Sequence, residues 1–135
     1  MKNSSFQLMG KPKIISFSYE TNRKFKFSES LPLAVTNNIR VVKSNDESVR
    51  NAVVIAKIGI FTEPNLEQAP FQIRVEIEGC FKWDDELQNN NARLETMLKQ
   101  NAPAILFSYV RPLITLITVE ANMPPLVIPL MNFTE

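Results

Sequence analysis

APAILFSYVR (Ala102–Arg111) begins the longest apolar stretch of the chain, and MPPL (Met123–Leu126) and Asn132-Phe133 follow it after one helix-length. Pro103 suits the first turn of a helix, where its missing N–H would have no intrahelical partner. Apolar residues then recur at helical spacing. These observations predict one long helix at residues 103–120, followed by a segment that no longer reads as helix.

The three segments, in this order and at this spacing, resemble the SecB family of bacterial protein-export chaperones. In that family a run close to P-N-I-L-F-P-Y-A-R opens the long helix, and an aromatic-Pro-Gln-Leu segment and then Asn-Phe come after it. A family strand of the form F-x-x-x-V-x-x-x-G-x-F is matched without a gap by Phe71, Val75, Gly79 and Phe81. The resemblance is therefore residue by residue over positions 70–133 and topological before them.

The resemblance implies an α+β fold in which a four-stranded antiparallel sheet carries helices on one face, as a single domain over residues 1–135. It also implies a homo-oligomer, a dimer or a tetramer, whose outer grooves hold unfolded polypeptide through aromatic and aliphatic side chains. Three departures limit what is carried over. Family members continue past Asn-Phe into a last helix, whereas here only Thr134 and Glu135 follow it. They commonly carry a Cys- and His-containing zinc tail that docks on the SecA motor, and this sequence has no His. They are strongly acidic, and this chain is near-neutral.

Because the zinc tail and the acidic surface are missing, only the holding of clients, and not their delivery to SecA, is carried over. In these respects the chain is more similar to the small, uncharacterised SecB-like proteins of Gram-positive bacteria than to the export chaperone itself.

Composition excludes several classes of function. The chain has 135 residues, enough for one domain that buries about two-thirds of its unfolded surface. It contains no His, one Cys and three Gly, so it lacks the ligands of a zinc site, the partners of a Ser-His or Cys-His nucleophile and a phosphate-binding glycine loop. We therefore expect no metal, no cofactor and no enzyme activity. Asp84-Asp85-Glu86, the one carboxylate cluster, is explained by helix capping.

Charge and hydropathy predict the environment. Fifteen basic and fourteen acidic residues make the chain near-neutral, which argues against a nucleic-acid partner. The run Arg23–Phe27 alternates cation and aromatic, and it fits a half-buried strand better than a strand that stacks bases. The N-terminus has no apolar signal-peptide core, and Arg111 and Pro112 interrupt the stretch Ala102–Val119 below the length of a membrane span. We expect a cytoplasmic protein that does not insert into membranes.

Period-two alternation predicts the strands. The pattern favours strands at Ile15–Tyr19, with Ile15, Phe17 and Tyr19 inward, at Lys24–Phe27 and at Ile39–Lys43. Asn51–Thr62 is largely apolar on both faces, with Lys57 as the exception, which is typical of a central strand or of a strand that packs against something on its second side. Phe71–Lys82 alternates most clearly, with its odd-numbered residues toward the core and its even-numbered residues toward water.

The helical half is less regular. Asp84 is a candidate N-cap, Asn89–Asn91 weakens the helix that follows, and Asn101 with Pro103 predicts a stop and a new start. The run Thr115–Val119 is β-branched and would read as a strand by propensity, and Pro112 predicts a kink. The prediction that residues 103–120 form a helix therefore rests on the family resemblance.

The predicted long helix is apolar around most of its circumference. One face of one sheet cannot cover such a helix, so a second surface is required, and another copy of the chain is the simplest source of it. Residues 122–129 contain three prolines and are expected to be extended, with Leu126–Ile128 as an apolar strap on the helix or sheet.

Two functions remain open. The first is an ATP-independent holdase that binds unfolded or preprotein segments through apolar grooves and main-chain pairing. The second is a SecB-fold interaction or scaffold protein with one dedicated protein partner. Candidate client-binding residues, each with an alternative role in the core or an oligomer interface, are Phe71, Ile73, Phe81, Trp83, Phe107, Tyr109, Leu126 and Ile128.

Overall fold

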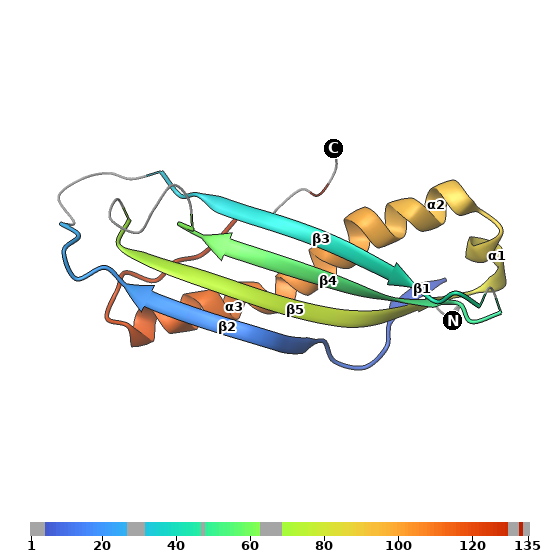
Figure 1. The fold of residues 1–135 in the computed structure, drawn as a ribbon, viewed down its shortest axis with the longest axis horizontal. Coiled ribbons are helices and arrows are strands. Elements are labelled where there is room, and N and C mark those ends of the chain that lie inside the picture. The colour runs from blue at the N-terminus through green and yellow to red at the C-terminus, as the bar shows by residue number, and fades with distance from the viewer. Residues whose placement is uncertain (1–4, 27–31, 47, 63–68, 130–132, 134–135) are drawn as a thin grey trace.

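The computed structural model describes residues 5–26, 32–46, 48–62, 69–129 and 133. Within these residues the chain forms one sheet followed by helices that lie on one face of it (Figure 1). The strands are β1 (Phe6–Leu8), β2 (Lys13–Thr21), β3 (Val35–Lys43), β4 (Asn51–Ile60) and β5 (Phe71–Trp83). The helical elements are α1 (Asp85–Gln88), α2 (Asn91–Thr96), the π-helical turn η2 (Met97–Asn101) and α3 (Ala102–Glu120).

The sheet has five strands but is four strands wide. Its order is β1-β5-β4-β3, and β2 also pairs with β5, with every pairing antiparallel. β1 meets the end of β5 at Trp83 and β2 meets its start at Phe71, so the two short strands share one edge of β5. Gly10, with a φ of 71°, and Pro12 interrupt the edge strand, because a left-handed residue and a missing N–H cannot continue the ladder. The predicted α+β class and antiparallel sheet are confirmed, with five strands in place of four.

The core lies between the sheet and α3. Odd-numbered residues of β5 and even-numbered residues of β4 are buried on this face, as the alternation predicted, and β4 is central between β3 and β5. Leu106, Val110 and Ile114 of α3 are buried against it. Gly79 lets α3 approach closely, because a Cβ at this position would lie 2.9 Å from Cδ2 of Leu106. We call the other face of the sheet the open face.

Two sequence-based assignments in the first half are wrong. The ladder between β2 and β5 shifts register between Ile14 and Ser16, so a bulge puts Ile14, and not Ile15, on the core side with Phe17. The expected strand at Lys24–Phe27 is a turn over its described part, in which the N–H of Lys24 donates to Oδ1 of Asn22 at 3.0 Å. Phe27 lies outside the described residues.

The helix caps and helix ends after β5 agree only in part with those predicted from the sequence. Oδ1 of Asp84 accepts from the N–H of Leu87 at 2.9 Å, which confirms the predicted N-cap. The asparagine run divides α1 from α2, and Oδ1 of Asn90 caps α2 by accepting from the N–H of Arg93. The predicted stop at Asn101 is absent, because η2 carries the helix through to α3 with one wider turn.

The segment after α3 turns back along it (Figure 1). Asn122 is left-handed, with a φ of 59°, and the N–H of Met123 donates to the carbonyl of Thr118 at 2.9 Å, which ends the helix as a Schellman-type cap. The residues that follow are extended, as predicted. Three side chains of α3 bind their backbone. The Leu126 N–H donates to Oγ1 of Thr118 (3.0 Å), the Thr115 hydroxyl donates to the Leu126 carbonyl (2.7 Å), and Nε of Arg111 donates to the Ile128 carbonyl (2.9 Å). We call residues 123–129 the strap.

Candidate functional site

Most of the residues predicted to bind a client lie in the core of the protomer. Phe71, Ile73, Phe81, Phe107 and Ile128 are buried, because the odd face of β5 lies under α3 and the strap covers the rest. A client cannot reach these side chains from the surface. Their burial supports the alternative role that the sequence left open for them, which is packing.

Trp83 is also held inside the protomer. Its side chain is 9% exposed, and its indole Nε1–H donates to Oε1 of Gln88 at 2.5 Å. It pairs with Phe6 across β1 and β5, and so it joins the end of the sheet to α1. Trp83 therefore anchors the first helix to the sheet.

Tyr109 and Leu126 keep accessible surface. Tyr109 is 40% exposed on α3, and Leu126 is half-buried in the strap. Client contact at these two residues stays a prediction.

An exposed apolar surface lies between β2 and α3. A hollow of about 340 Å³ there has lining that is almost wholly apolar. Leu116 is 56% exposed and Ile14 is 38% exposed at this hollow. We call this the β2–α3 surface, and it is formed by Ile14, Phe17, Leu113, Leu116, Ile117 and Glu120.

A stripe on α3 extends the β2–α3 surface. Tyr109, Leu113, Leu116 and Glu120 follow one another at helical spacing, so they lie on one side of the helix. The apolar periodicity of the helix carried this signal in the sequence. The contribution of Ile14 was hidden by the β-bulge.

The outer edge of β3 is the second candidate surface. Among the described residues, no strand pairs with β3 on the side away from β4. The bonds from Phe61 N–H to the Ala34 carbonyl (2.9 Å) and from Ser44 N–H to the Asn51 carbonyl (3.3 Å) fix which groups face β4. Because this pattern alternates in an antiparallel ladder, even-numbered residues of β3 bond to β4 and odd-numbered residues direct their N–H and C=O groups outward.

Within the described residues, this edge has neither a proline nor a bulge along its length. Natural sheets block their edges with prolines, bulges or inward-pointing charges. β3 contains no proline, and its register with β4 is unbroken from Val35 to Lys43. Val35, Ile39 and Val41 lie on the core side of the edge and are half-buried, so part of their apolar surface remains available beside the free backbone groups.

A charge cluster fixes α2 beside the end of this edge. The ammonium of Lys43 bonds to Oε1 of Glu95, and the ammonium of Lys99 lies 3.2 Å from Oε2 of the same carboxylate. The hydrogen bond from Lys43 is the main cause that lowers the pKa of Glu95. Burial opposes this effect, and Lys99 adds to the lowering. Lys43, the last residue of β3, is thereby held against α2.

Within the described residues, no group of three or more His, Cys, Asp and Glu side chains could hold a metal ion. The helical segment Asn91–Glu120 has the length and composition of a membrane span, and 39% of its most apolar window is buried inside the protein. A helix that forms a core passes the same test. The absence of membrane insertion stays a prediction.

Comparison with known proteins agrees with this geometry. Residues 2–135 match the family model described as preprotein translocase subunit SecB. An uncharacterised Methanocaldococcus jannaschii protein, MJ0357, is 31% identical over 91 residues, which are 67% of this chain and 57% of that protein. The chain thus spans little more than half of that relative. The protein-export protein SecB of Anaplasma phagocytophilum is 25% identical over 135 residues, 99% of this chain and 84% of that protein.

A solved structure shares the fold. The Mycobacterium tuberculosis SecB-like chaperone Rv1957, in complex with a ChAD peptide from the Rv1956 HigA1 antitoxin, matches with a TM-score of 0.68. The match covers 97% of this chain and 94% of that chain at 14% identity. At that identity the likeness concerns the fold alone.

Proposed function

Because the chain belongs to the SecB family, we propose that it is a cytoplasmic, ATP-independent holdase that binds extended segments of unfolded polypeptide. It acts as a homo-oligomer and catalyses no reaction. The observation that carries this proposal is the edge of β3, which pairs with no other described strand and has neither a proline nor a bulge.

The β3 edge supplies what an extended client needs. Its outward N–H and C=O groups pair with the main chain of any sequence, which suits a holdase that does not read one motif. Val35, Ile39 and Val41 offer apolar contact to alternate side chains of the added strand. Leu126, which is half-buried in the strap, keeps its predicted role as a client contact.

The β2–α3 surface is assigned to a second copy of the chain. Its exposed residues form a stripe of large aliphatic and aromatic side chains, and monomeric proteins rarely leave such a surface in water. The β-bulge in β2 weakens main-chain pairing at that edge and leaves side-chain packing as the main contact. Tyr109, in this stripe, takes the alternative role that the sequence left open, in the interface between copies.

The test is suppression of aggregation of an unrelated unfolded protein. Asn37→Pro removes one outward N–H of β3 and leaves the ladder to β4 intact, since proline is tolerated on a sheet edge. Loss of one edge hydrogen bond, worth about 1 kcal/mol, should weaken client binding roughly fivefold. Asn38→Pro is the comparison variant, because it removes a bond to β4 and should lower folding stability instead. Unchanged suppression by a folded Asn37→Pro variant would contradict client binding at this edge.

A second function is favoured by one observation. The SecB-like chaperone that shares the fold was solved with a peptide from an antitoxin. A chain that serves one dedicated partner would use the same edge with a narrow choice of sequences. Binding measurements with several unrelated unfolded proteins separate the two functions, since a holdase binds most of them and a dedicated partner protein binds none.

A further inference from the structure

The open face of the sheet carries more basic than acidic side chains. Across β2 to β5 the register places five cations and three carboxylates on it. The cations are Lys13, Arg40, Lys57, Arg74 and Lys82, and the carboxylates are Glu20, Glu76 and Glu78. This is unlike the chain as a whole, which is near-neutral.

Two of the three carboxylates lie directly opposite a lysine. Glu76 pairs with Lys57 across β5 and β4, with 3.7 Å between Nζ and Oε1, and Glu78 is opposite Lys13 in the register with β2. Arg40 is opposite Ile55, and Arg74 is opposite Ser18 and Gly59. The two arginines therefore have no acidic residue directly across from them.

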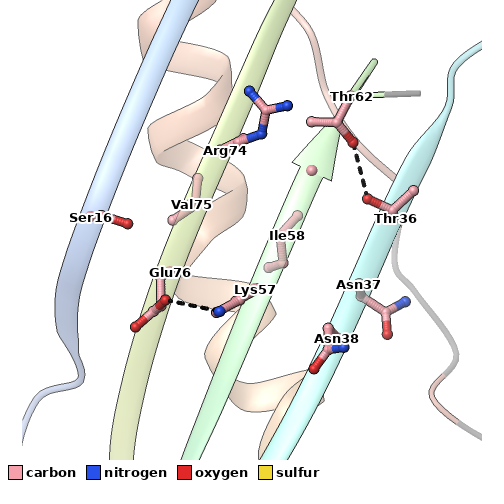
Figure 2. Close-up of a pocket in the computed structure, with 11 residues that line it drawn as sticks. Ser16, Thr36, Asn37, Asn38, Lys57, Ile58, Thr62, Arg74, Val75 and Glu76 are labelled. Atoms are coloured by element: carbon pink, nitrogen blue, oxygen red, sulfur yellow. Dashed lines mark hydrogen bonds and ion pairs between the residues drawn. The ribbon is translucent and has the colours of Figure 1, made fainter. Parts of the chain in front are cut away.

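Two adjoining hollows connect these arginines. One, of about 440 Å³, is lined by Arg74 and Lys57, and the other, of about 120 Å³, is lined by Arg40 and Lys57. The two hollows share Asn38, Lys57 and Glu76. Together they are bordered by three cations, on β3, β4 and β5, and by a single carboxylate. Figure 2 shows the larger hollow, with the side chains of Arg74 and Lys57 on neighbouring strands.

Neutral hydrogen-bonding groups complete the lining. Nη1 of Arg74 donates to Oε1 of Gln72 at 2.7 Å, which leaves its other guanidinium N–H groups available. Thr36 and Thr62 place their hydroxyls over Gly59, 3.3 Å apart (Figure 2). A Cβ at Gly59 would lie 2.6 Å from Oγ1 of Thr62, so any side chain there would displace these hydroxyls.

We infer that the open face is a docking site for an acidic, extended segment of a partner protein. With strands about 4.8 Å apart and a rise of about 3.3 Å per residue, the backbones of Arg40 and Arg74 are roughly 16 Å apart, the reach of about five extended residues. Guanidinium groups bind carboxylates with two parallel hydrogen bonds. Two acidic side chains separated by a few residues would meet both arginines, and Asn38 and the threonines would bind the intervening main chain.

A nucleic acid fits this surface less well. Binding of single strands depends on aromatic side chains on which bases stack. The residues that line the two hollows include no aromatic side chain. Three cations beside one carboxylate are also too few for a phosphate backbone with a charge at every nucleotide.

The probe is a fluorescein-labelled peptide of alternating Glu and Ser, with the same peptide carrying Lys in place of Glu as its control. We expect the Glu peptide to bind the full chain at low ionic strength and the Lys peptide not to bind. The double variant Arg40→Gln/Arg74→Gln should weaken binding about tenfold, since each exposed ion pair contributes up to about a factor of five. Arg93→Gln is the matched control, because Arg93 is exposed on α2 in the helical layer. Its affinity should equal that of the wild type.

Two further variants make the outcome decisive. The double variant Arg40→Glu/Arg74→Glu should prefer the Lys peptide. Val35→Pro removes an outward N–H of the client edge at the first residue of β3, lines neither hollow and should keep full affinity for the Glu peptide. Failure of the client edge and failure of this site are therefore distinguishable. The inference is overturned if the wild type does not bind the Glu peptide, or if its affinity survives loss of both arginines in a variant with an unchanged thermal midpoint. Tighter binding of polyuridylic acid with the same arginine dependence would replace the acidic segment by a nucleic acid and overturn it as well.

Discussion

Thr118 shows how single side chains decide the form of the second half. It belongs to a β-branched run that favours a strand by propensity, yet its buried hydroxyl lies 2.8 Å from the carbonyl of Thr115 and accepts from the N–H of Leu126 at 3.0 Å. Thr115 and Arg111 donate to the strap carbonyls of Leu126 and Ile128. These residues keep the helix because their polar groups bind the strap along its side.

Replacement of Thr118 by Val should therefore destabilise the protein. It keeps the shape of the side chain but leaves the Leu126 N–H without its acceptor, at a cost of about 1–3 kcal/mol in the free energy of unfolding. Thr118→Ser keeps the hydroxyl and should lose less. Denaturant unfolding of both variants checks this, and a larger loss in Thr118→Ser than in Thr118→Val would show that the methyl group, and not the hydroxyl, matters.

Trp83 belongs to the scaffold in this account. Trp83→Ala removes a large side chain that joins β5 to α1, and we expect a loss of roughly 3–5 kcal/mol in folding stability. Val127→Ala, at a residue that is 69% exposed on the strap, should change stability by less than about 0.5 kcal/mol. Thermal or denaturant unfolding measures both. A Trp83→Ala variant with wild-type stability and weak client binding would return Trp83 to the binding site.

Glu95 gives a pH dependence with a defined sign. Its pKa is lowered in the folded protein, chiefly by the hydrogen bond from Lys43, so its contribution is present above the ordinary pKa of a glutamate and is lost as pH falls through the folded value. Because the pair is partly exposed, Glu95→Gln should cost no more than about 0.5 kcal/mol at neutral pH. Unfolding of the wild type and of the variant should converge in acid. A difference that grows below pH 4 would contradict this sign.

At the scale of elements, the sequence predicted what short-range patterns determine. The alternation of β5, the central place of β4 and the Asp84 cap are all confirmed. The bulge beside Ile15 was not predicted, because a bulge shifts every side chain after it without changing the local composition. The π-helical turn that carries the helix past Asn101 likewise has no distinct residue pattern.

The candidate site was harder to predict than the fold. Aromatic and aliphatic side chains look alike in sequence whether they line a groove or fill a core, and the burial of Phe71, Phe81 and Phe107 depends on where α3 crosses the sheet. The free edge of β3 is a property of topology, and no residue of β3 marks it as an edge. The charges of the open face were visible only as alternate polar positions of separate strands whose pairing was unknown.

The β2–α3 surface predicts how copies assemble. Leu116→Glu places a charge in the middle of the exposed stripe and should weaken self-association, because an unpaired charge cannot be buried cheaply in an apolar interface. Val127→Glu adds the same charge at an exposed apolar residue outside that surface and should leave assembly unchanged. The molar mass from light scattering distinguishes the variants. A wild type that is a monodisperse monomer at micromolar concentration would rule out this assignment.

At the scale of the whole molecule, three surfaces are assigned to three different binding partners. We propose that copies of the chain meet at the β2–α3 surface, that clients add to the β3 edge, and that the open face receives an acidic partner segment. The β2–α3 surface shares no residue with the other two. The client edge and the open face both use β3, but the edge presents outward main-chain groups at odd-numbered residues and the open face presents side chains at even-numbered ones. A general holdase requires this separation, because its client must bind without dissociating the oligomer.

Amide hydrogen exchange of the folded protein, with and without an unfolded client, tests the central claim most directly. The outward N–H groups of Val35, Asn37, Ile39 and Val41 should exchange fast in the free protein and become protected when a client strand pairs with them. The even-numbered amides of β3, already bonded to β4, should change little. Protection that appears on α3 and β2 instead, with no change at the four odd-numbered amides, would contradict the account.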